Sequence, residues 1–374
     1  MNILLLSAYD AQSHKRWRIG LVSQFAKYQW TVLSLPPRFF SWRLRGNAYS
    51  WFMRNRSELE QNYDLIIATS MVELSALRSL LPSIANIPTI LYFHENQFAY
   101  PLQRKEQQRE LMHFRLSSIY SAISATTLLF NSEYNRRSFL EGVRFFLRSM
   151  PDFAPKSIVE ELSNKASVLP VPLEDELFER KDIPLTLSSP DELLLVWNHR
   201  WEYDKGPEIL LKTLELCKIN SIPFKIAVLG QQFSNSPSCF QEIKKKYSAD
   251  LLYFGYLPEK EDYLNMVQAC DIILSTALHE FQGLAILEAI ALGLTPVAPN
   301  RLAYPEFVPP ELLYPSFPDD IQKDATELCK LLMSIAQNKK TRLSYSVDVS
   351  HLSWSSLRPH YQNIIEEIAA RTIF

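Results

Sequence analysis

Short apolar runs alternate with longer amphipathic stretches along this chain of 374 residues. The runs are rich in Ile, Leu and Val, as are strands buried on both faces of a parallel sheet. The strands that we expect span residues 2–7, 30–35, 64–69, 89–94, 126–131 and 167–171, then 193–198, 225–229, 251–254, 271–275 and 295–298. Strands and helices that alternate in this way form βα units. The pattern therefore predicts an α/β fold with parallel sheets.

The length of the chain predicts two domains, because single hydrophobic cores stop growing at about 250–300 residues. Prolines and acidic residues at 170–176, and a stretch around 184–190, mark the connection between them. We expect one Rossmann-like domain over residues 1–172 and a second over 173–354. Most expected strands end in polar residues or glycine, and ligands bind beyond the carboxyl ends of parallel strands. We therefore expect the two sheets to face an interdomain cleft.

The composition is that of a soluble globular protein, with 47% hydrophobic and 21% charged residues. The apolar run from Ile3 to Leu6 is too short for a membrane span or signal peptide and is typical of a strand. The four cysteines form no C-x-x-C pair, which favours buried thiols in a reducing cytoplasm over a zinc site. Neither a G-x-G-x-x-G fingerprint nor a Walker A loop is present, which disfavours a nicotinamide cofactor and a P-loop protein, and no cofactor is expected.

The net charge of −2 conceals two halves of opposite sign. Residues 1–172 carry 20 Lys and Arg against 13 Asp and Glu, a net charge of +7. Residues 173–374 carry 19 against 28, a net charge of −9. A basic half beside an acidic half suggests that the first domain faces a polyanion.

The stretch from Ser275 to Glu288 has the layout of a binding site at a helix start. An apolar strand leads into a polar turn, and a helix is expected to begin near Gly283, with Glu280 before it and Glu288 inside it. Backbone N–H groups at a helix start favour an anion, and the two carboxylates can accept hydrogen bonds from hydroxyls on either side. The turn residues that we assign to this site are His279, Phe281, Gln282, Gly283 and Leu284. The alternative is a plain strand–turn–helix unit with a loop carboxylate and a solvated helix Glu.

Two cations follow the first strand of the second half, in the segment Asn198 to Pro207. Arg200 offers paired donors and Lys205 a point charge, so together they can neutralise a diphosphate. A helix is expected to open at Gly206-Pro207, where proline suits the first helical position. The alternative is a loop with two solvated cations.

Polar residues also follow three strands of the first half. His94, Asn96 and Gln97 come directly after a buried run, and we expect them to face a sugar or an acceptor, unless His94 is a satisfied core or loop histidine. Asn131 and Ser132 follow another strand. After the first strand, Ser13 is a plausible N-cap, which would place His14, Lys15 and Arg16 at the mouth of the site.

Aromatic residues and arginines are interleaved from Arg38 to Arg56, and this segment includes Trp42 and Arg43. Aromatic rings stack on unpaired bases and Arg pairs with phosphate, which is how single-stranded RNA is held. One alternative is an amphipathic helix that buries its aromatics and solvates its arginines. Another is a basic helix that lies on a membrane surface.

Taken together, these segments resemble the family-4 retaining glycosyltransferases of the GT-B fold. Within them, the likeness spans nearly the whole chain for the family of tRNA-queuosine α-mannosyltransferases. It is carried by Glu280 with Glu288 and by Arg200 with Lys205, together with residues 13–15, 92–97, 100–101, 130–132, 198–202, 204–205, 255–258, 275–277, 279–281, 287–289 and 304–306. One departure is Ala11-Gln12, which stands where that family usually has two glycines.

The resemblance implies transfer of mannose from GDP-mannose to the cyclopentenediol of queuosine in a tRNA anticodon, with no metal required. It implies that Arg200 and Lys205 hold the diphosphate, Glu280 the mannose hydroxyls and Glu288 the ribose. His94 would lie near the transferring sugar and His14 near the diphosphate or acceptor. A helix at 355–370 is expected to cross back onto the first domain.

Three other functions are compatible with the same residues. The chain could glycosylate a lipid or a glycan, could bind RNA without catalysis, or could epimerise a sugar nucleotide. Binding to vesicles, the lack of any reaction with sugar nucleotides, and the identity of the product would separate these alternatives.

Overall fold

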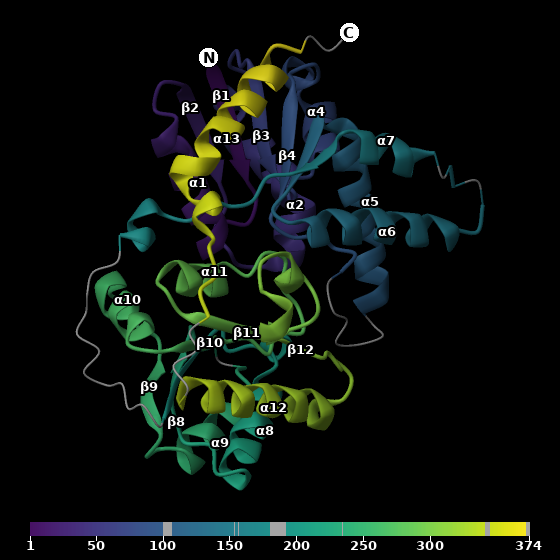
Figure 1. The fold of residues 1–374 in the computed structure, drawn as a ribbon. Helices are drawn as coiled ribbons and strands as arrows, with labels where there is room; N and C mark the ends of the chain where they lie inside the picture. The colour runs from purple at the N-terminus through teal and green to yellow at the C-terminus, as the bar shows by residue number, and fades with distance from the viewer. Residues whose placement is uncertain are drawn as a thin grey trace. The chain divides into compact units, whose positions relative to one another are not determined.

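The structure, a computed structural model, describes residues 1–99, 107–152, 154–155, 157–179, 192–233, 235–340 and 345–371. The chain forms two compact units, one of Met1–Pro172 with Ser355–Phe374 and the other of Leu173–Trp354. Figure 1 shows the elements of each unit. Of the stretches singled out in the sequence, residues 184–190 and 100–101 lie outside the described ranges.

The first unit is built on a six-stranded parallel sheet in the order β2-β1-β3-β4-β5-β6. Its strands are β1 (Asn2–Ser7), β2 (Gln29–Ser34), β3 (Leu65–Thr69), β4 (Thr89–Phe93), β5 (Thr127–Phe130) and β6 (Ala166–Val168). Its helices are α1 (Gln12–Gln24), α2 (Phe40–Arg54), α3 (Arg56–Leu59), α4 (Leu74–Leu80), α5 (Gln107–Ser124), α6 (Glu133–Arg148), α7 (Ile158–Asn164) and α13 (Trp354–Ala369). Every residue of β3, β4 and β5 is buried, which explains why these strands are continuous apolar runs.

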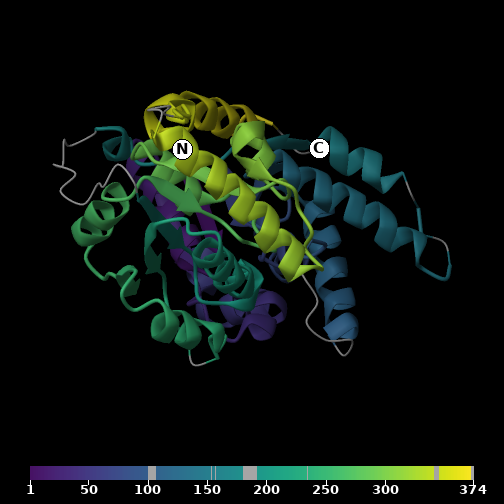
Figure 2. The same ribbon diagram turned by 60° about the horizontal axis from the view of Figure 1, so that its bottom comes forward.

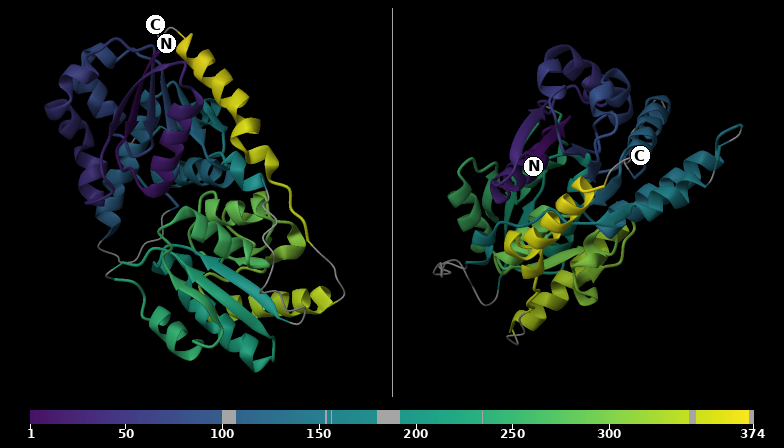
Figure 3. Two further views of the ribbon diagram at one scale, coloured as in Figure 1. Left: turned by 90° about the vertical axis from the view of Figure 1, so that its left-hand side faces the viewer. Right: turned by 90° about the horizontal axis from the view of Figure 1, so that it is seen from above.

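The second unit is built on a six-stranded parallel sheet in the order β12-β11-β10-β7-β8-β9, and its strands are visible in Figure 3. Its strands are β7 (Leu193–Asn198), β8 (Phe224–Leu229), β9 (Leu251–Gly255), β10 (Ile272–Leu274), β11 (Thr295–Pro299) and β12 (Leu313–Tyr314). Its helices are α8 (Pro207–Ile219), α9 (Cys239–Lys246), α10 (Lys260–Gln268), α11 (Leu284–Ala291) and α12 (Ile321–Lys340). Helices α8 and α12 pack on each other (Figure 2).

The strand order of each sheet reverses at one point, and ligands bind at such points in open α/β sheets. In the second unit the reversal lies between β7 and β10, and in the first it lies between β1 and β3. The segments expected to bind the donor follow β7 and β10. The expected strands are confirmed to within three residues at each end, while the two-residue β12 had no counterpart among them.

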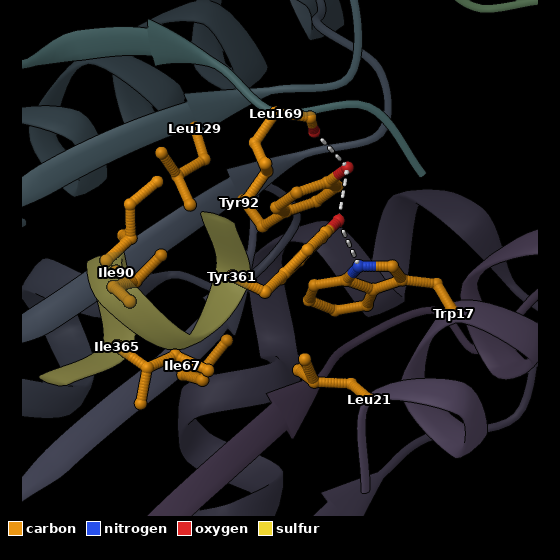
Figure 4. A pocket seen from close by; sticks show the side chains of 10 residues that line it. Trp17, Leu21, Ile67, Ile90, Tyr92, Leu129, Leu169, Tyr361 and Ile365 are labelled. Carbon is orange, nitrogen blue, oxygen red and sulfur yellow. Dashed lines mark hydrogen bonds between the residues drawn. The ribbon is translucent and has the colours of Figure 1, made fainter. Parts of the chain in front are cut away.

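The last helix, α13, belongs to the first unit, where its Tyr361 lies among buried aromatic residues (Figure 4). Trp17 of α1 donates from Nε1 to the Tyr361 hydroxyl at 3.0 Å, and the Tyr361 hydroxyl donates to the Pro170 carbonyl at 2.9 Å. The Tyr92 hydroxyl donates to the Leu169 carbonyl at 2.7 Å. These bonds satisfy buried polar groups that would otherwise destabilise the unit, and they fix α13 beside the sheet.

The four cysteines are free thiols and are buried, as predicted. Among the described helices, none combines the length and the apolar character that a bilayer crossing requires.

Candidate active site

The turn after β10 leads into α11 at Gly283, as the sequence predicts. Gly283 has a φ of 80°, and a Cβ at this position would lie 3.1 Å from the Phe307 ring and 3.2 Å from the Tyr304 ring. A positive φ together with such close contacts strongly favours glycine at this position. The helix start therefore depends on this residue.

The Glu280 carboxylate lies at the start of α11. It accepts a hydrogen bond from the Phe281 N–H at 3.1 Å and another from the Gly283 N–H. We expected these N–H groups to face an anionic ligand, but in this structure they bind the side chain of Glu280. A carboxylate at a helix N-terminus is stabilised by the exposed N–H groups and the helix dipole. Leu284 and Gln282 adjoin this start, and Gln282 is buried.

The ammonium group of Lys205 is buried beside two carboxylates. Its Nζ donates to the His279 carbonyl at 2.7 Å and lies 3.4 Å from both Glu280 Oε2 and Asp204 Oδ2. The sequence therefore correctly associated Lys205 with the turn after β10, although 75 residues separate Lys205 from Glu280. We call Asp204, Lys205, His279 and Glu280 the lysine cluster.

The charges of the lysine cluster keep one another ionised. Burial alone would lower the pKa of Lys205, but Glu280 and Asp204 outweigh it and raise that pKa. Burial would raise the pKa of Glu280, but Lys205, His199 and His279 lower it to about 2. Burial would likewise raise the pKa of Asp204, but its hydrogen bond with His279 and the charge of Lys205 lower it. At neutral pH the cluster therefore holds one buried cation between two anions.

The loop that carries Lys205 lies directly against the turn after β10. The Asp204 carbonyl accepts from the N–H groups of Leu278 at 2.8 Å and His279 at 3.1 Å. The Thr276 hydroxyl donates to the Lys205 carbonyl at 2.8 Å. Gly206, with a φ of 63°, is the N-cap of α8, and Pro207 is its first residue as expected. These contacts position the lysine cluster from both loops at the switch point of the sheet.

A Gly206→Ala substitution should disrupt this loop contact. The added Cβ would lie 2.1 Å from the Thr276 carbonyl oxygen, on a backbone that is already left-handed. We expect a loss of at least about 2 kcal/mol in the free energy of unfolding, measured by urea denaturation of the full chain. The left-handed φ of 63° alone would cost an alanine about 1 kcal/mol. A loss no larger than that would show that the contact with Thr276 contributes nothing.

Asn198 and Glu288 are linked through Tyr263, which was not among the predicted site residues. Asn198 Nδ2 donates to the Tyr263 hydroxyl at 2.9 Å, and this hydroxyl donates to Glu288 Oε2 at 3.1 Å. Tyr263 belongs to α10, and no local pattern in the sequence marks it. The chain orients Glu288, which is half-buried on α11.

Arg200 differs from Lys205 in its surroundings. Its side chain is 54% exposed and pairs with Glu202 at 3.0 Å. It still lies close enough to the lysine cluster to lower the pKa of both Lys205 and Asp204. The structure thus provides one buried and one exposed cation after β7.

His199 and Ser275 form a buried network near the lysine cluster, and neither was among the expected site residues. His199 Nε2 lies 3.1 Å from Ser275 Oγ, which lies 2.6 Å from the Tyr304 hydroxyl. Burial, with the charge of Lys205, lowers the pKa of His199 to about 3, so this ring is neutral at physiological pH. The network links the loop after β7 to the start of the turn after β10 and to Tyr304.

In the first unit, His14 and His94 are brought together although 80 positions separate them. Their rings stack with centroids 4.1 Å apart, and His14 Nδ1 lies 2.8 Å from the Tyr9 carbonyl oxygen. Burial, with the neighbouring His14, lowers the pKa of His94 well below its usual value. Within the described part of the chain, His94 Nε2 is buried and makes no hydrogen bond. Such an atom requires a partner, and a ligand can supply it.

The expectation that Ser13 caps α1 is wrong. The helix begins two residues earlier than that cap would place it, at Gln12, and its N-cap is Ala11, whose carbonyl accepts from the Lys15 N–H. Asp10 pairs with Arg18 on the second turn at 2.8 Å, which ties the preceding loop to the helix. Ala11 has a φ of −61°, so the backbone here does not need the glycine that is usual in the family that this chain resembles. Ser13 and Lys15 are exposed on the first turn of α1 and Arg16 is half-buried.

The polar residues after β4 and β5 form a buried network. Asn96 Nδ2 donates to Asn135 Oδ1 at 2.8 Å, and Asn131 Nδ2 donates to the His94 carbonyl at 2.9 Å. Ser132 caps α6 by accepting from the Asn135 N–H. These bonds give Asn96, Asn131 and Ser132 a structural role, and Gln97 beside them is buried. Their contact with an acceptor stays a prediction.

Comparison with known proteins places this architecture in a class. A TM-score of 0.67 and coverage of 98% of this chain relate it to HepE of Anabaena in complex with UDP and glucose, at 14% identity. Sucrose-phosphate synthase from Thermosynechococcus elongatus has the same TM-score and identity, and 99% of each chain is covered. A model described as "Glycosyl transferases group 1" matches residues 179–342. The fold and the matched region are those of a GT-B glycosyltransferase.

A second pair of matches is more specific. The model described as "tRNA-queuosine alpha-mannosyltransferase N-terminal" matches residues 2–173. The Drosophila melanogaster protein "tRNA-queuosine alpha-mannosyltransferase" is 33% identical over 371 residues, which cover 98% of this chain and 97% of the relative. This chain belongs to the tRNA-queuosine alpha-mannosyltransferase family.

Proposed function

We propose that this enzyme transfers mannose from GDP-mannose to the cyclopentenediol of queuosine in a tRNA anticodon, with retention of the α configuration. The name of the Drosophila relative and the match to its N-terminal family model support the acceptor and the sugar. The observation that carries the proposal within this chain is the lysine cluster at the β7/β10 switch point, where a sugar nucleotide binds in folds of this kind.

Each predicted site residue of the second unit has a proposed role that follows from its charge or its hydrogen bonds. Lys205 and Arg200 are cations that stabilise the negative charge of the departing diphosphate. Glu280, ionised at neutral pH, can only accept hydrogen bonds, which suits it to the hydroxyls of mannose. Glu288, oriented by Tyr263, accepts from the ribose. His279, Phe281 and Asn198 contribute the surrounding surface.

The proposed reaction is a displacement on the front face of the sugar. The acceptor oxygen forms a bond to the anomeric carbon as the bond to the diphosphate oxygen breaks. The acceptor proton passes to the departing diphosphate, so GDP leaves. Fixed charges around a leaving group are usually the largest catalytic contribution. In the first unit, the buried His94 Nε2 makes no hydrogen bond among the described residues, which makes His94 a candidate ligand-binding residue, and His14 stacks on its ring.

The proposal is tested by incubating the full chain with GDP-mannose and tRNA that contains queuosine, followed by mass spectrometry of the nucleosides. We expect the mass of one hexose to be added to queuosine. UDP-glucose and GDP-glucose serve as competing donors. The absence of any hexose on queuosine with every donor would contradict the proposal, and a hexosylated lipid or glycan would favour another acceptor.

Binding of tRNA should weaken steeply as salt is added, because the first unit is basic. Each phosphate neutralised by Lys or Arg releases counterions, so we expect affinity to fall at least about tenfold between roughly 50 and 200 mM salt. Fluorescence anisotropy with labelled tRNA measures the slope. An affinity that does not change with salt would exclude the basic surface as the tRNA-binding surface.

A further inference from the structure

Five side chains form one exposed line along α2 of the first unit. They recur every three or four residues, which places them on one face of the helix. They are Phe39 at the N-cap, then Trp42, Arg45, Tyr49 and Met53, and we call them the α2 stripe. The four apolar members are 69%, 52%, 59% and 61% exposed, respectively. An aligned row of exposed apolar side chains indicates a binding surface.

The opposite face of α2 fixes the helix to the unit. Asn47 is fully buried, its Nδ2 donates to the Met71 carbonyl at 3.0 Å, and its Oδ1 accepts from the Glu73 N–H at 3.0 Å. Leu44 and Trp51 are buried on the same side. The stripe is therefore the outer face of an anchored helix, and its side chains cannot turn inward.

Local contacts or the backbone conformation restrict two members of the α2 stripe. The Trp42 ring lies against Gly46, where a Cβ would come within 2.8 Å of three ring atoms. Phe39 has a φ of 55°, a conformation that residues other than glycine rarely adopt and that is frequent at binding sites. The Arg38 guanidinium lies 5.7 Å from the centre of the Phe39 ring. Aromatic surfaces that are fixed in advance lose little entropy on binding.

The stripe begins at the edge of the sheet that carries the two histidines. Helix α2 follows β2, and Phe40 packs edge-on against Tyr9 with ring centroids 5.6 Å apart. The carbonyl oxygen of Tyr9 is bonded to His14, which stacks on His94. An RNA strand with one nucleotide beside the two histidines would reach the Phe39 end of the stripe. It could then continue along the stripe for about 20 Å.

We propose that the α2 stripe binds unpaired bases of the RNA that flank the modified nucleotide, an inference that rests on the proposed function. Phe39, Trp42 and Tyr49 offer faces on which bases stack, and Arg45 lies among them to pair with phosphate. The net charge of +7 on residues 1–172 complements RNA. A helix that inserts into a bilayer keeps its cations on the face opposite its apolar residues, whereas here Arg45 lies within the apolar line. Trp42 and Arg43 were both expected to contact the acceptor, and this stays a prediction. Trp42 lies in the stripe, whereas Arg43 lies outside it and donates from Nε to the Pro36 carbonyl at 3.3 Å.

The test compares Trp42→Ala and Tyr49→Ala with Tyr120→Ala in the full chain. Tyr120 is 54% exposed on α5, so it is a matched aromatic control outside the stripe. Anisotropy is measured with a fluorescent anticodon stem–loop RNA without queuosine, and with a closed duplex of the same length. We expect each stripe variant to bind the stem–loop about 5- to 100-fold more weakly, with little change for the duplex or for Tyr120→Ala.

A second comparison separates stacking from charge. Arg45→Gln should reduce the salt slope of stem–loop binding by about one, whereas Trp42→Ala should leave that slope unchanged. Three results would each overturn the proposal. Trp42→Ala could bind the stem–loop as tightly as the wild type, or Tyr120→Ala could lose as much affinity as the stripe variants. Alternatively, the stripe variants could lose binding only to vesicles of phosphatidylcholine and phosphatidylserine and keep their affinity for the stem–loop. Because the readout is RNA affinity, a failure to transfer mannose would contradict the proposed function without affecting this result.

Discussion

A Lys205→Met variant is expected to lose about 3–5 kcal/mol of folding free energy, because the substitution leaves Asp204 and Glu280 as buried carboxylates without their shared cation. Methionine fills a similar volume, so the loss reports charge and not packing. Urea unfolding of the full chain gives the magnitude. Hydrogen exchange followed by mass spectrometry locates it, and we expect protection to fall in peptides from residues 193–340 and to persist in those from 1–172. The same variant should also be inactive in transfer.

The double variant Lys205→Met/Glu280→Gln is the control for this interpretation. It removes one of the two stranded charges, so it should recover part of the loss, with a coupling of about 0.5–3 kcal/mol. The pH dependence of the free energy of unfolding gives an independent check. The pKa of Glu280 is lowered from 4.5 to about 2, so its stabilisation is complete above pH 4.5 and is lost as the pH falls towards 2. A stability in Lys205→Met equal to that of the wild type would contradict the buried ion cluster.

The fold could be predicted from the sequence because parallel strands are buried on both faces. The runs 2–7 and 193–198 coincide with β1 and β7, since each has a continuous apolar centre and ends at a polar residue. Strand β12 contains only Leu313 and Tyr314, too few residues for any period to be visible. The Ser13 prediction failed because a capping residue was inferred from local preference, whereas the observed helix start lacks a side-chain cap.

Only part of the candidate site could be predicted, because strand order can be inferred from the sequence but contacts between distant helices cannot. Lys205 and Glu280 each follow a strand at the switch point, so strand order alone brings them together. Tyr263 lies on a helix, 65 residues from Asn198 and 25 from Glu288, and only the tertiary structure places it between them. On α2 the sequence left burial and exposure of the aromatics equally open, and the structure divides them, with Trp51 buried and Trp42 exposed.

A Glu280→Gln variant is expected to lower the rate of mannose transfer by about 100-fold or more, the size of effect seen when one group of a preorganised electrostatic site is removed. Glutamine keeps the shape and can still accept the Phe281 N–H bond, but it is neutral and places a donor beside the sugar hydroxyls. Lys205 retains Asp204, so the loss of stability should be well below that of Lys205→Met.

Steady-state kinetics with GDP-mannose determines what Glu280 contributes. A fall in kcat with an unchanged KM would assign its hydrogen bonds to the transition state, and a rise in KM alone would assign them to ground-state binding of the donor. Glu215→Gln is the matched control, because Glu215 lies in the same unit and pairs with Lys212 and Lys246 outside the lysine cluster. A transfer rate for Glu280→Gln within threefold of the wild type, with the Glu215→Gln rate also unchanged, would remove Glu280 from the donor site. The buried ion pair between Lys205 and Glu280 would then have a structural role alone, because no sugar hydroxyl would bind the Glu280 carboxylate.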